Sequence, residues 1–215
     1  MIYRYKVYDL IWDSPLTQAV VAAAFNNHAY TGLAVDLGCG TGLGSGSLVK
    51  SGWHVIGVDK SEPMLLRAME RGRISKAVLA DAEDTGLATG LADLVLVDNL
   101  LHLHPDPHSV LVEASRLVKP DGSIVCVWPL ESVSLGQALL QDLASGRNLA
   151  QSLIAATLRL AVGVYGACVG ARRWPSETVD DLVSKWSQAS GARLLNSGTV
   201  LNMEIYAVYE LPFIV

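Results

Sequence analysis

Five short apolar runs, separated by stretches with helical spacing, constrain the fold of this chain more than any other feature. Continuous apolar runs that end in a polar residue or a glycine are typical of strands covered on both faces, as in a parallel sheet. Because strand and helix patterns alternate, we predict an α/β, doubly wound fold. The runs are LAVDLG (33–38), HVIGVD (54–59), AVLAD (77–81), DLVLVDN (93–99) and SIVCVW (123–128).

Helix boundaries are visible between these runs. The stretch 61–72 opens with Ser61, which we expect to cap a helix, and ends at a glycine. The stretch 106–122 has apolar residues at helical spacing and stops at a proline and a glycine, with Asp106 as its expected cap. A helix at about 176–190 and two runs that read as an antiparallel pair, LLNSGTVL and EIYAVYEL, close the pattern.

The alternation breaks between residues 129 and 175, where no strand pattern is found. A chain of 215 residues suits one domain with an insertion, so we expect residues 1–215 to be a single domain with an inserted helical lid at 129–175. Within the insertion, residues 153–171 approach membrane length but contain Arg159 and three glycines. We therefore expect no membrane span.

Composition limits the partners and the compartment. The formal net charge of -5 leaves no basic footprint, so we expect no nucleic-acid partner, and we interpret Arg67, Arg71 and Arg73 as a solvated helix face. The three cysteines include no CxxC pair, which favours a reducing compartment. The first 13 residues lack the apolar core of a signal peptide, so we expect a cytoplasmic protein.

A glycine-rich turn, GCGTGLGSG (38–46), follows the first predicted strand. Glycines in a strand-to-helix turn let the backbone approach a ligand and direct free N–H groups at it. A Walker A loop would need a GK[ST] ending, which is absent, and no frame of the turn fits the dinucleotide pattern GxGxxG. Both classes of nucleotide site are therefore disfavoured, and a turn without a ligand remains the alternative.

Acidic residues stand at the ends of the next two predicted strands. Asp59 ends the second strand, where a carboxylate can accept hydrogen bonds from both hydroxyls of a ribose. Asp81 ends the third strand and is followed by Ala82, where a carboxylate can accept from an exocyclic amino group such as that of adenine. These acids predict a nucleoside ligand, whereas any one alone would suit a solvated strand end.

Five motifs in register resemble those of class I S-adenosylmethionine-dependent methyltransferases, in the small-molecule branch with a UbiE-like or methyltransferase type 11 core. The resemblance covers residues 30–128 and extends to the final helix and hairpin at 176–215. It implies a Rossmann-like seven-stranded sheet and S-adenosyl-L-methionine as the cofactor. The motifs are VDLGCGTG, GVDKSEPML, ADAEDTGL, DLVLVDNLLHLHPD and RLVKPDGSIVCV.

The resemblance also implies a role for each matching residue. The turn would pass under the methionine part of the cofactor, Asp59 would bind the ribose, and Asp81 would face the adenine amino group. An N-terminal lid helix within residues 1–29 would cover the cofactor, with Tyr8 as the candidate contact to the methionine carboxylate. The full expected cofactor set is Tyr8, Asp36, Gly38, Cys39, Gly40, Gly42, Asp59, Lys60, Met64, Asp81, Ala82, Asp98 and Asn99.

The stretch HLHPDPH (102–108) has the alternation of a metal site. A metal would require the chain to stay extended through two prolines and would need a fourth ligand. In the resembled family a similar segment crosses the mouth of the cofactor pocket, so we expect no metal here. His102 is the candidate general base, with a structural, hydrogen-bonded histidine as the alternative.

The sequence thus predicts a methyltransferase that acts on a small, largely apolar organic acceptor. The alternative is a protein of the same fold that binds S-adenosylmethionine and catalyses a non-methylating rearrangement or dehydration. A homodimer is compatible with the apolar insertion, since large apolar patches often mark an interface.

Overall fold

The computed structural model describes most of the predicted core. Tyr8, the rest of the predicted N-terminal lid except Asp9, and most of the predicted insertion lie outside the described residues. The described residues are 31–130, 148–154, 174–200 and 204–212, together with the single positions 9, 136, 139, 140, 143, 156 and 157.

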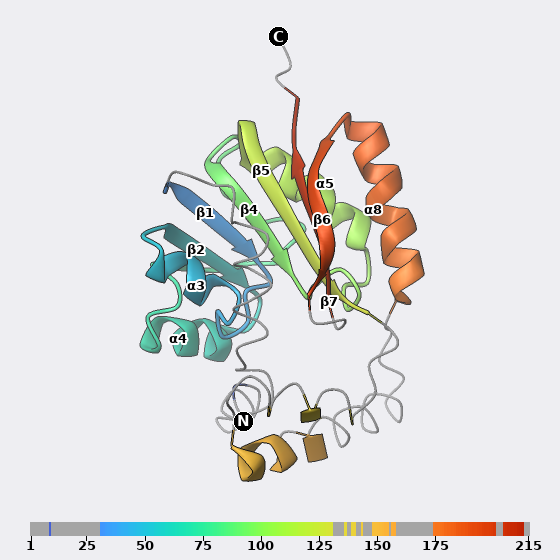
Figure 1. Cartoon of the computed structure of the whole chain (residues 1–215). Coiled ribbons are helices and arrows are strands. Elements are labelled where there is room, and N and C mark those ends of the chain that lie inside the picture. Colours follow the sequence, from blue (N-terminus) through green and yellow to red (C-terminus); the bar gives the residue numbers. More distant parts are fainter. Residues whose placement is uncertain are drawn as a thin grey trace.

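One seven-stranded sheet, in the order β3-β2-β1-β4-β5-β7-β6, forms the centre of the described structure (Figure 1). The first five strands are mutually parallel, and β7 runs antiparallel between β5 and β6. This confirms the predicted sheet with its closing antiparallel hairpin. The strands are β1 (Leu33–Leu37), β2 (His54–Asp59), β3 (Lys76–Leu79), β4 (Ala92–Asp98), β5 (Val118–Pro129), β6 (Arg193–Val200) and β7 (Glu204–Glu210).

Helices cover both faces of the sheet, as the doubly wound prediction requires. The helices α3 (Ser45–Lys50) and α4 (Glu62–Glu70) pack on the β2 and β3 side, whereas α5 (Pro107–Leu117) and α8 (Ser176–Ser190) pack against β4 and β5 (Figure 1). The residues that precede α4 and α5 are Ser61 and Asp106, as predicted. The Asp106 carboxylate accepts from the His108 and Ser109 N–H groups, whereas Ser61 makes no side-chain cap bond.

Strand periodicity divides the apolar residues into two cores. In β4, Leu94 and Leu96 face the core under α3 and α4, and Val95 and Val97 face the core under α5 and α8. All four are fully buried because successive side chains of a strand point to opposite faces and both faces are covered. The uninterrupted apolar run in the sequence therefore has a direct structural cause.

Two strand boundaries differ from the prediction. The strand β3 ends at Leu79, two residues before Asp81, because the chain turns there and Asp81 forms an isolated bridge with Asp84. The strand β5 begins at Val118 and includes the proline that was expected to end the preceding helix.

Residues 149–154 are helical and lie beyond the ends of β1 and β4 (Figure 1). Among the described residues, no helix is long and apolar enough to cross a membrane.

Candidate functional site

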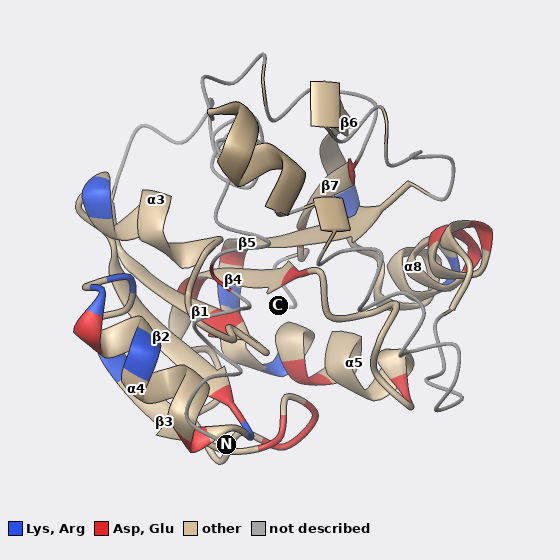
Figure 2. Cartoon of the chain, turned by 90° about the horizontal axis from the view of Figure 1, so that it is seen from below, with Lys and Arg blue, Asp and Glu red and all other residues tan. Residues whose placement is uncertain are grey.

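Parallel strands end together at one edge of the sheet, and acidic residues lie at this edge. In a view onto it, acidic segments gather near β1 and β4 (Figure 2). Asp36 lies next to the end of β1, Asp59 is the last residue of β2, and Asp98 is the last residue of β4. Because carboxyl ends of strands are where open α/β sheets bind ligands, this edge is the candidate site.

The glycine turn between β1 and α3 has the backbone conformation that only glycine adopts easily. Gly38, Gly40 and Gly42 have φ angles of 68°, 53° and 73°. A Cβ at Gly38 would lie 2.8 Å from the Leu100 side chain, and one at Gly42 would lie 2.8 Å from the Cβ of Arg73. At Gly40 no atom of the described residues lies within 4 Å of an added Cβ, so among these residues the backbone of the turn is open to a ligand.

Asp59 fixes the glycine turn to the end of β2. Its Oδ2 atom accepts from the Gly40 N–H group at 2.8 Å, and its Oδ1 atom accepts from the Ser61 N–H group at 2.8 Å. Each carboxylate oxygen has more than one acceptor site, so both oxygens can still accept from a ligand hydroxyl. The sequence predicted a ligand role for Asp59, and the structure adds this contact with the turn.

Asp36 is buried beside the start of α3. Its side chain accepts a short hydrogen bond from the Ser45 hydroxyl, and its Oδ1 atom is buried with no partner among the described residues. Burial raises the pKa of Asp36 to about 7, with a smaller contribution from Asp59, although Ser45 opposes the shift. Ser45 was not predicted as a site residue, although its position as the first residue of the helix after the turn was a usable signal.

Asp98 shares a bridging amide with a glutamate from a distant strand. The Asn99 side-chain amide donates to Asp98 Oδ1 and to Glu204 Oε1, both at 3.1 Å. Burial, and then the charges of Glu204 and Asp36, raise the pKa of Asp98 well above its usual value, and burial raises the pKa of Glu204. Sequence reasoning missed Glu204, because its presence at this edge depends on the antiparallel direction of β7.

The residues predicted beside adenine lie at the tips of β2 and β3. Asp81 is exposed, and its Oδ1 atom accepts from the Ala82 N–H group at 2.8 Å. Burial raises the pKa of Asp81, but the hydrogen bonds from His104 and Ala82 and the charge of Lys60 outweigh it, so the net shift is downward. Lys60 is exposed and Met64 is half-buried, one turn into α4. An ionised Asp81 retains the acceptor capacity that the prediction requires.

The Cys39 side chain points into the core, away from the open side of the glycine turn. Its Sγ atom lies against Gly57, where an added Cβ would approach to 2.8 Å, and the residue belongs to the core under α3 and α4. Burial, with the charges of Asp36 and Asp59, raises the pKa of the Cys39 thiol far above its usual range. Any contact of Cys39 with a ligand is therefore restricted to its backbone.

The stretch 102–108 is folded into a turn and is not extended. The backbone N–H groups of Leu103 and His104 both donate to the Leu100 carbonyl, so His102 and His104 do not share one face. His104 is buried, with Nδ1 2.8 Å from the Asp106 carbonyl oxygen and Nε2 3.4 Å from an Asp81 carboxylate oxygen. Within the described ranges, no group of three or more His, Cys, Asp or Glu side chains could hold a metal ion.

His102, the first residue of this loop, is also buried. Its carbonyl oxygen accepts from the Trp174 backbone N–H group at 2.9 Å, and the Trp174 indole N–H group donates to the His104 carbonyl at 2.9 Å. These bonds fix the loop to the residue that leads into α8. They do not test the predicted role of His102 as a base.

An arginine pair holds Asp9 against the back of the glycine turn. Asp9 Oδ2 accepts from Arg67 Nε at 2.9 Å, and Asp9 Oδ1 accepts from Arg73 Nη1 at 3.0 Å. Arg73 is only 9% exposed and also donates to the Thr41 carbonyl of the turn at 3.2 Å. The interpretation of this cluster as a solvated helix face was therefore wrong for Arg73, because a distant carboxylate neutralises it.

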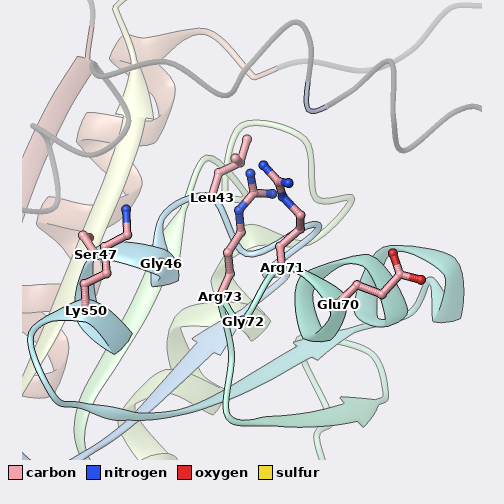
Figure 3. Close-up of a pocket in the computed structure, with 8 residues that line it drawn as sticks. All are labelled: Leu43, Gly46, Ser47, Lys50, Glu70, Arg71, Gly72 and Arg73. Carbon is pink, nitrogen blue, oxygen red and sulfur yellow. The ribbon is translucent and has the colours of Figure 1, made fainter.

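A polar pocket of about 420 Å³ lies between α3 and the C-terminal end of α4 (Figure 3). None of the described residues of the predicted cofactor set lines it, so we do not assign it to the cofactor. Lys50 and Arg71 stand where helix carbonyls end, and cations at that end offset the helix dipole. The lining residues are Leu43, Gly46, Ser47, Lys50, Glu70, Arg71, Gly72 and Arg73.

Comparison with known proteins connects this edge to a family. Residues 35–126 match the family model described as "Methyltransferase domain". Over 101 residues the chain is 37% identical to the ubiquinone biosynthesis O-methyltransferase of Methylococcus capsulatus, a match that covers 42% of this chain but only 40% of that protein. Over 192 residues it is 29% identical to the demethylmenaquinone methyltransferase of Clavibacter sepedonicus, covering 85% of this chain and 72% of that protein.

A solved structure shares the fold over nearly the whole chain. The 1,6-didemethyltoxoflavin-N1-methyltransferase of Burkholderia thailandensis, crystallised with bound 1,6-didemethyltoxoflavin and S-adenosylhomocysteine, superimposes with a TM-score of 0.65. The sequence identity is 16%, and the match covers 98% of this chain and 84% of that one. At this identity the likeness supports the fold alone.

Proposed function

We propose that this chain methylates a small organic acceptor. The premise is that residues 35–126 belong to the class I S-adenosylmethionine-dependent methyltransferases of the UbiE-like branch. The observation that carries the proposal is the open glycine turn between two strand-end carboxylates. Gly40 leaves free space at the backbone, and Asp59 faces the same turn. Both features suit a nucleoside whose amino-acid tail lies along the turn.

The described residues fit S-adenosylmethionine. Asp59 would hold the ribose hydroxyls, and Asp81 with the Ala82 backbone would hold the adenine amino group. The Asp36 Oδ1 atom, buried without a partner among the described residues, would accept from the cofactor's ammonium group directly or through water. When bound, the cofactor supplies an activated methyl group on a sulfonium, so the protein's task is mainly to position an acceptor and exclude water.

The acceptor is proposed to be a small, largely apolar molecule that carries a hydroxyl group. An oxygen acceptor is supported by the similar protein of Methylococcus capsulatus, which is an O-methyltransferase. The insertion at 129–175 leaves the sheet after β5, at the edge where the acceptor would enter, and Figure 1 draws the helix at 149–154 beyond that edge. Leu153 and Ile154 are both about half exposed there and would supply apolar surface.

Two experiments test this function. Calorimetric titration with S-adenosylhomocysteine should show binding with a 1:1 stoichiometry, and incubation with methyl-labelled S-adenosylmethionine should label members of a panel of phenols and enols. Mass spectrometry of the product separates methyl transfer from a rearrangement or dehydration, because only transfer adds a methyl group. Binding without labelled product across the panel would favour the non-methylating alternative.

A deletion tests the role of the insertion. Replacing residues 135–170 by a short linker should preserve S-adenosylhomocysteine binding, because the described cofactor residues lie outside that range, and should abolish acceptor turnover. If the variant instead becomes a monomer from a dimer and retains its acceptor kinetics, the insertion is an interface and the apolar acceptor has no support.

A further inference from the structure

Three carboxyl groups, from the buried Asp36 and the half-buried Asp98 and Glu204, lie along the carboxyl edge of the sheet. Besides burial, the pKa values of these carboxyl groups are shifted by charges within the group and by Asp59, Ser45 and Asn99. No cationic side chain of the described residues contributes to these shifts. Asp36 and Asp98 belong to the cofactor set that the sequence predicts. Glu204 has no role in it, although its Oε2 atom is buried.

Sheet topology places Glu204 on the acceptor side of the site. It is the first residue of β7 and pairs with Pro129, the last residue of β5, so it lies at the carboxyl edge despite belonging to an antiparallel strand. The residues predicted to hold the nucleoside lie at the ends of β2 and β3, and β1 and β4 separate these strands from β5 and β7. The edge around Glu204 is therefore the part that the cofactor leaves to an acceptor.

Asn99 holds the carboxyl groups of Asp98 and Glu204 in a defined arrangement. It has a φ angle of 54°, a left-handed conformation that is uncommon for a residue other than glycine, and its N–H group donates to the Val127 carbonyl at 2.9 Å. Both hydrogens of its side-chain amide are used, one on each carboxyl group. Glu204 Oε2 is then left buried, with no partner in the part of the chain that the structure describes.

A buried carboxylate oxygen without a donor is strongly unfavourable, so it must acquire a proton or a donor from a ligand. We propose that Glu204 is the general base of the methyl transfer and that its Oε2 atom takes the proton of the acceptor's hydroxyl group. This inference rests on the proposed function. As the acceptor oxygen forms its bond to the methyl carbon, the carbon–sulfur bond breaks, its electron pair remains on sulfur, and the hydroxyl proton passes to Glu204.

Electrostatics favours this coupling. Methyl transfer removes the positive charge of the sulfonium, and proton uptake by Glu204 removes one negative charge from the carboxyl cluster, so the net charge of the enclosed site is unchanged. Without the sulfonium, ionised Glu204 and ionised Asp98 oppose each other, because the charge of Glu204 raises the pKa of Asp98 and the repulsion is mutual. The bound cofactor therefore keeps the base ionised, and its conversion to product favours the protonated form.

Turnover of Glu204→Gln provides the first test. With the panel's best hydroxyl acceptor, kcat/KM should fall by about 100-fold or more, while S-adenosylhomocysteine affinity stays within about threefold of wild type. With a nitro-substituted analogue of that acceptor, already ionised at the assay pH, the loss should shrink to less than about tenfold because no proton has to be removed. The matched control, Glu210→Gln at the opposite end of β7, should change neither value.

Two outcomes of that test would overturn the proposal. An equal loss on both acceptors would give Glu204 a positioning role only, and a weakened affinity for S-adenosylhomocysteine would place it in the cofactor site. The same two acceptors are used with His102→Ala, for which we expect any loss of kcat/KM to be equal on both. If His102→Ala instead loses more on the hydroxyl acceptor than on its ionised analogue, and Glu204→Gln does not, His102 is the base.

Proton release provides a second test that needs no acceptor. Calorimetry at pH 7 in phosphate and in Tris, whose ionisation enthalpies differ, should show that S-adenosylmethionine releases about one more proton on binding than S-adenosylhomocysteine does. Glu204→Gln should remove most of this difference, and Glu210→Gln should preserve it. Equal release with both ligands in the wild type would refute the proposal even if methyl transfer is confirmed. Failure of the wild type to bind either ligand would instead refute the proposed function, which is the premise of this inference.

Discussion

Asp59→Ala separates the structural role of the β2 carboxylate from its proposed role in cofactor binding. In the structure its two oxygens accept from the Gly40 and Ser61 N–H groups, each at 2.8 Å. Hydrogen bonds to a charged group contribute about 1.5 to 3 kcal/mol each, and since Asp59 is half-exposed and the released N–H groups can reach water, we expect a loss of roughly 2 to 3 kcal/mol. For a chain of this length the midpoint of thermal unfolding should fall by about 4 to 12 °C.

Cofactor affinity should fall further than this loss of stability can explain. Removing two charge-assisted bonds to the ribose hydroxyls should weaken S-adenosylhomocysteine binding by about 100-fold or more. Calorimetry well below the variant's unfolding midpoint measures this effect on folded protein. The control is Asp181→Ala, which removes an exposed carboxylate that pairs with Lys185 at 2.7 Å and should affect neither quantity.

The two parts of this reasoning can fail separately. If folded Asp59→Ala binds S-adenosylhomocysteine within about threefold of wild type, Asp59 does not hold the ribose. If the unfolding midpoint does not change, the carboxylate does not stabilise the glycine turn, whatever happens to binding.

Three further predictions concern the turn, the buried acid and the histidine loop. Gly42→Ala should lose about 2 to 5 kcal/mol of stability, because its φ is 73° and the added Cβ would lie 2.8 Å from the Cβ of Arg73. Gly86→Ala should lose only about 1 to 2 kcal/mol, because at its φ of 65° no described atom lies within 4 Å of the added Cβ. Urea unfolding compares the two variants, and equal losses would refute the steric argument. Because burial raises the pKa of Asp36 from 3.8 to about 7, the folded state binds an extra proton between these pH values, and stability falls as pH rises through them. Asp36→Asn should remove the contribution of Asp36 to this decline, so the stability of the variant relative to wild type should rise by about 2 to 4 kcal/mol between pH 5 and pH 8. A constant difference would contradict this prediction. Elemental analysis of untagged protein should find no stoichiometric zinc, iron or manganese, and a bound metal that is lost together with activity in a His102→Ala, His104→Ala double variant would show that the histidine loop is a metal site.

The sequence determined the elements and the chemistry of the strand ends. Apolar runs predicted β1, β2, β4 and β5 because a strand buried on both faces needs no polar alternation, whereas the run of β3 belongs to a mostly exposed strand at the sheet edge. Asp106 predicted the start of α5 because its carboxylate can accept from the first free N–H groups of a helix. The glycines between β1 and α3 predicted an open turn, since only glycine adopts left-handed conformations readily. These features are local, so they could be predicted without tertiary contacts.

Only the tertiary structure decided which distant residues complete the site. Asn99 contacts Glu204 across 105 positions because β7 runs antiparallel to β5, and Arg73 is buried because it binds Asp9, 64 positions away. A carboxylate or an arginine looks the same in the sequence whether it faces water or a charged partner, because its local pattern does not encode the partner's approach. The pKa of each buried carboxyl depends on this packing, since desolvation and neighbouring charge arise only when the strands come together.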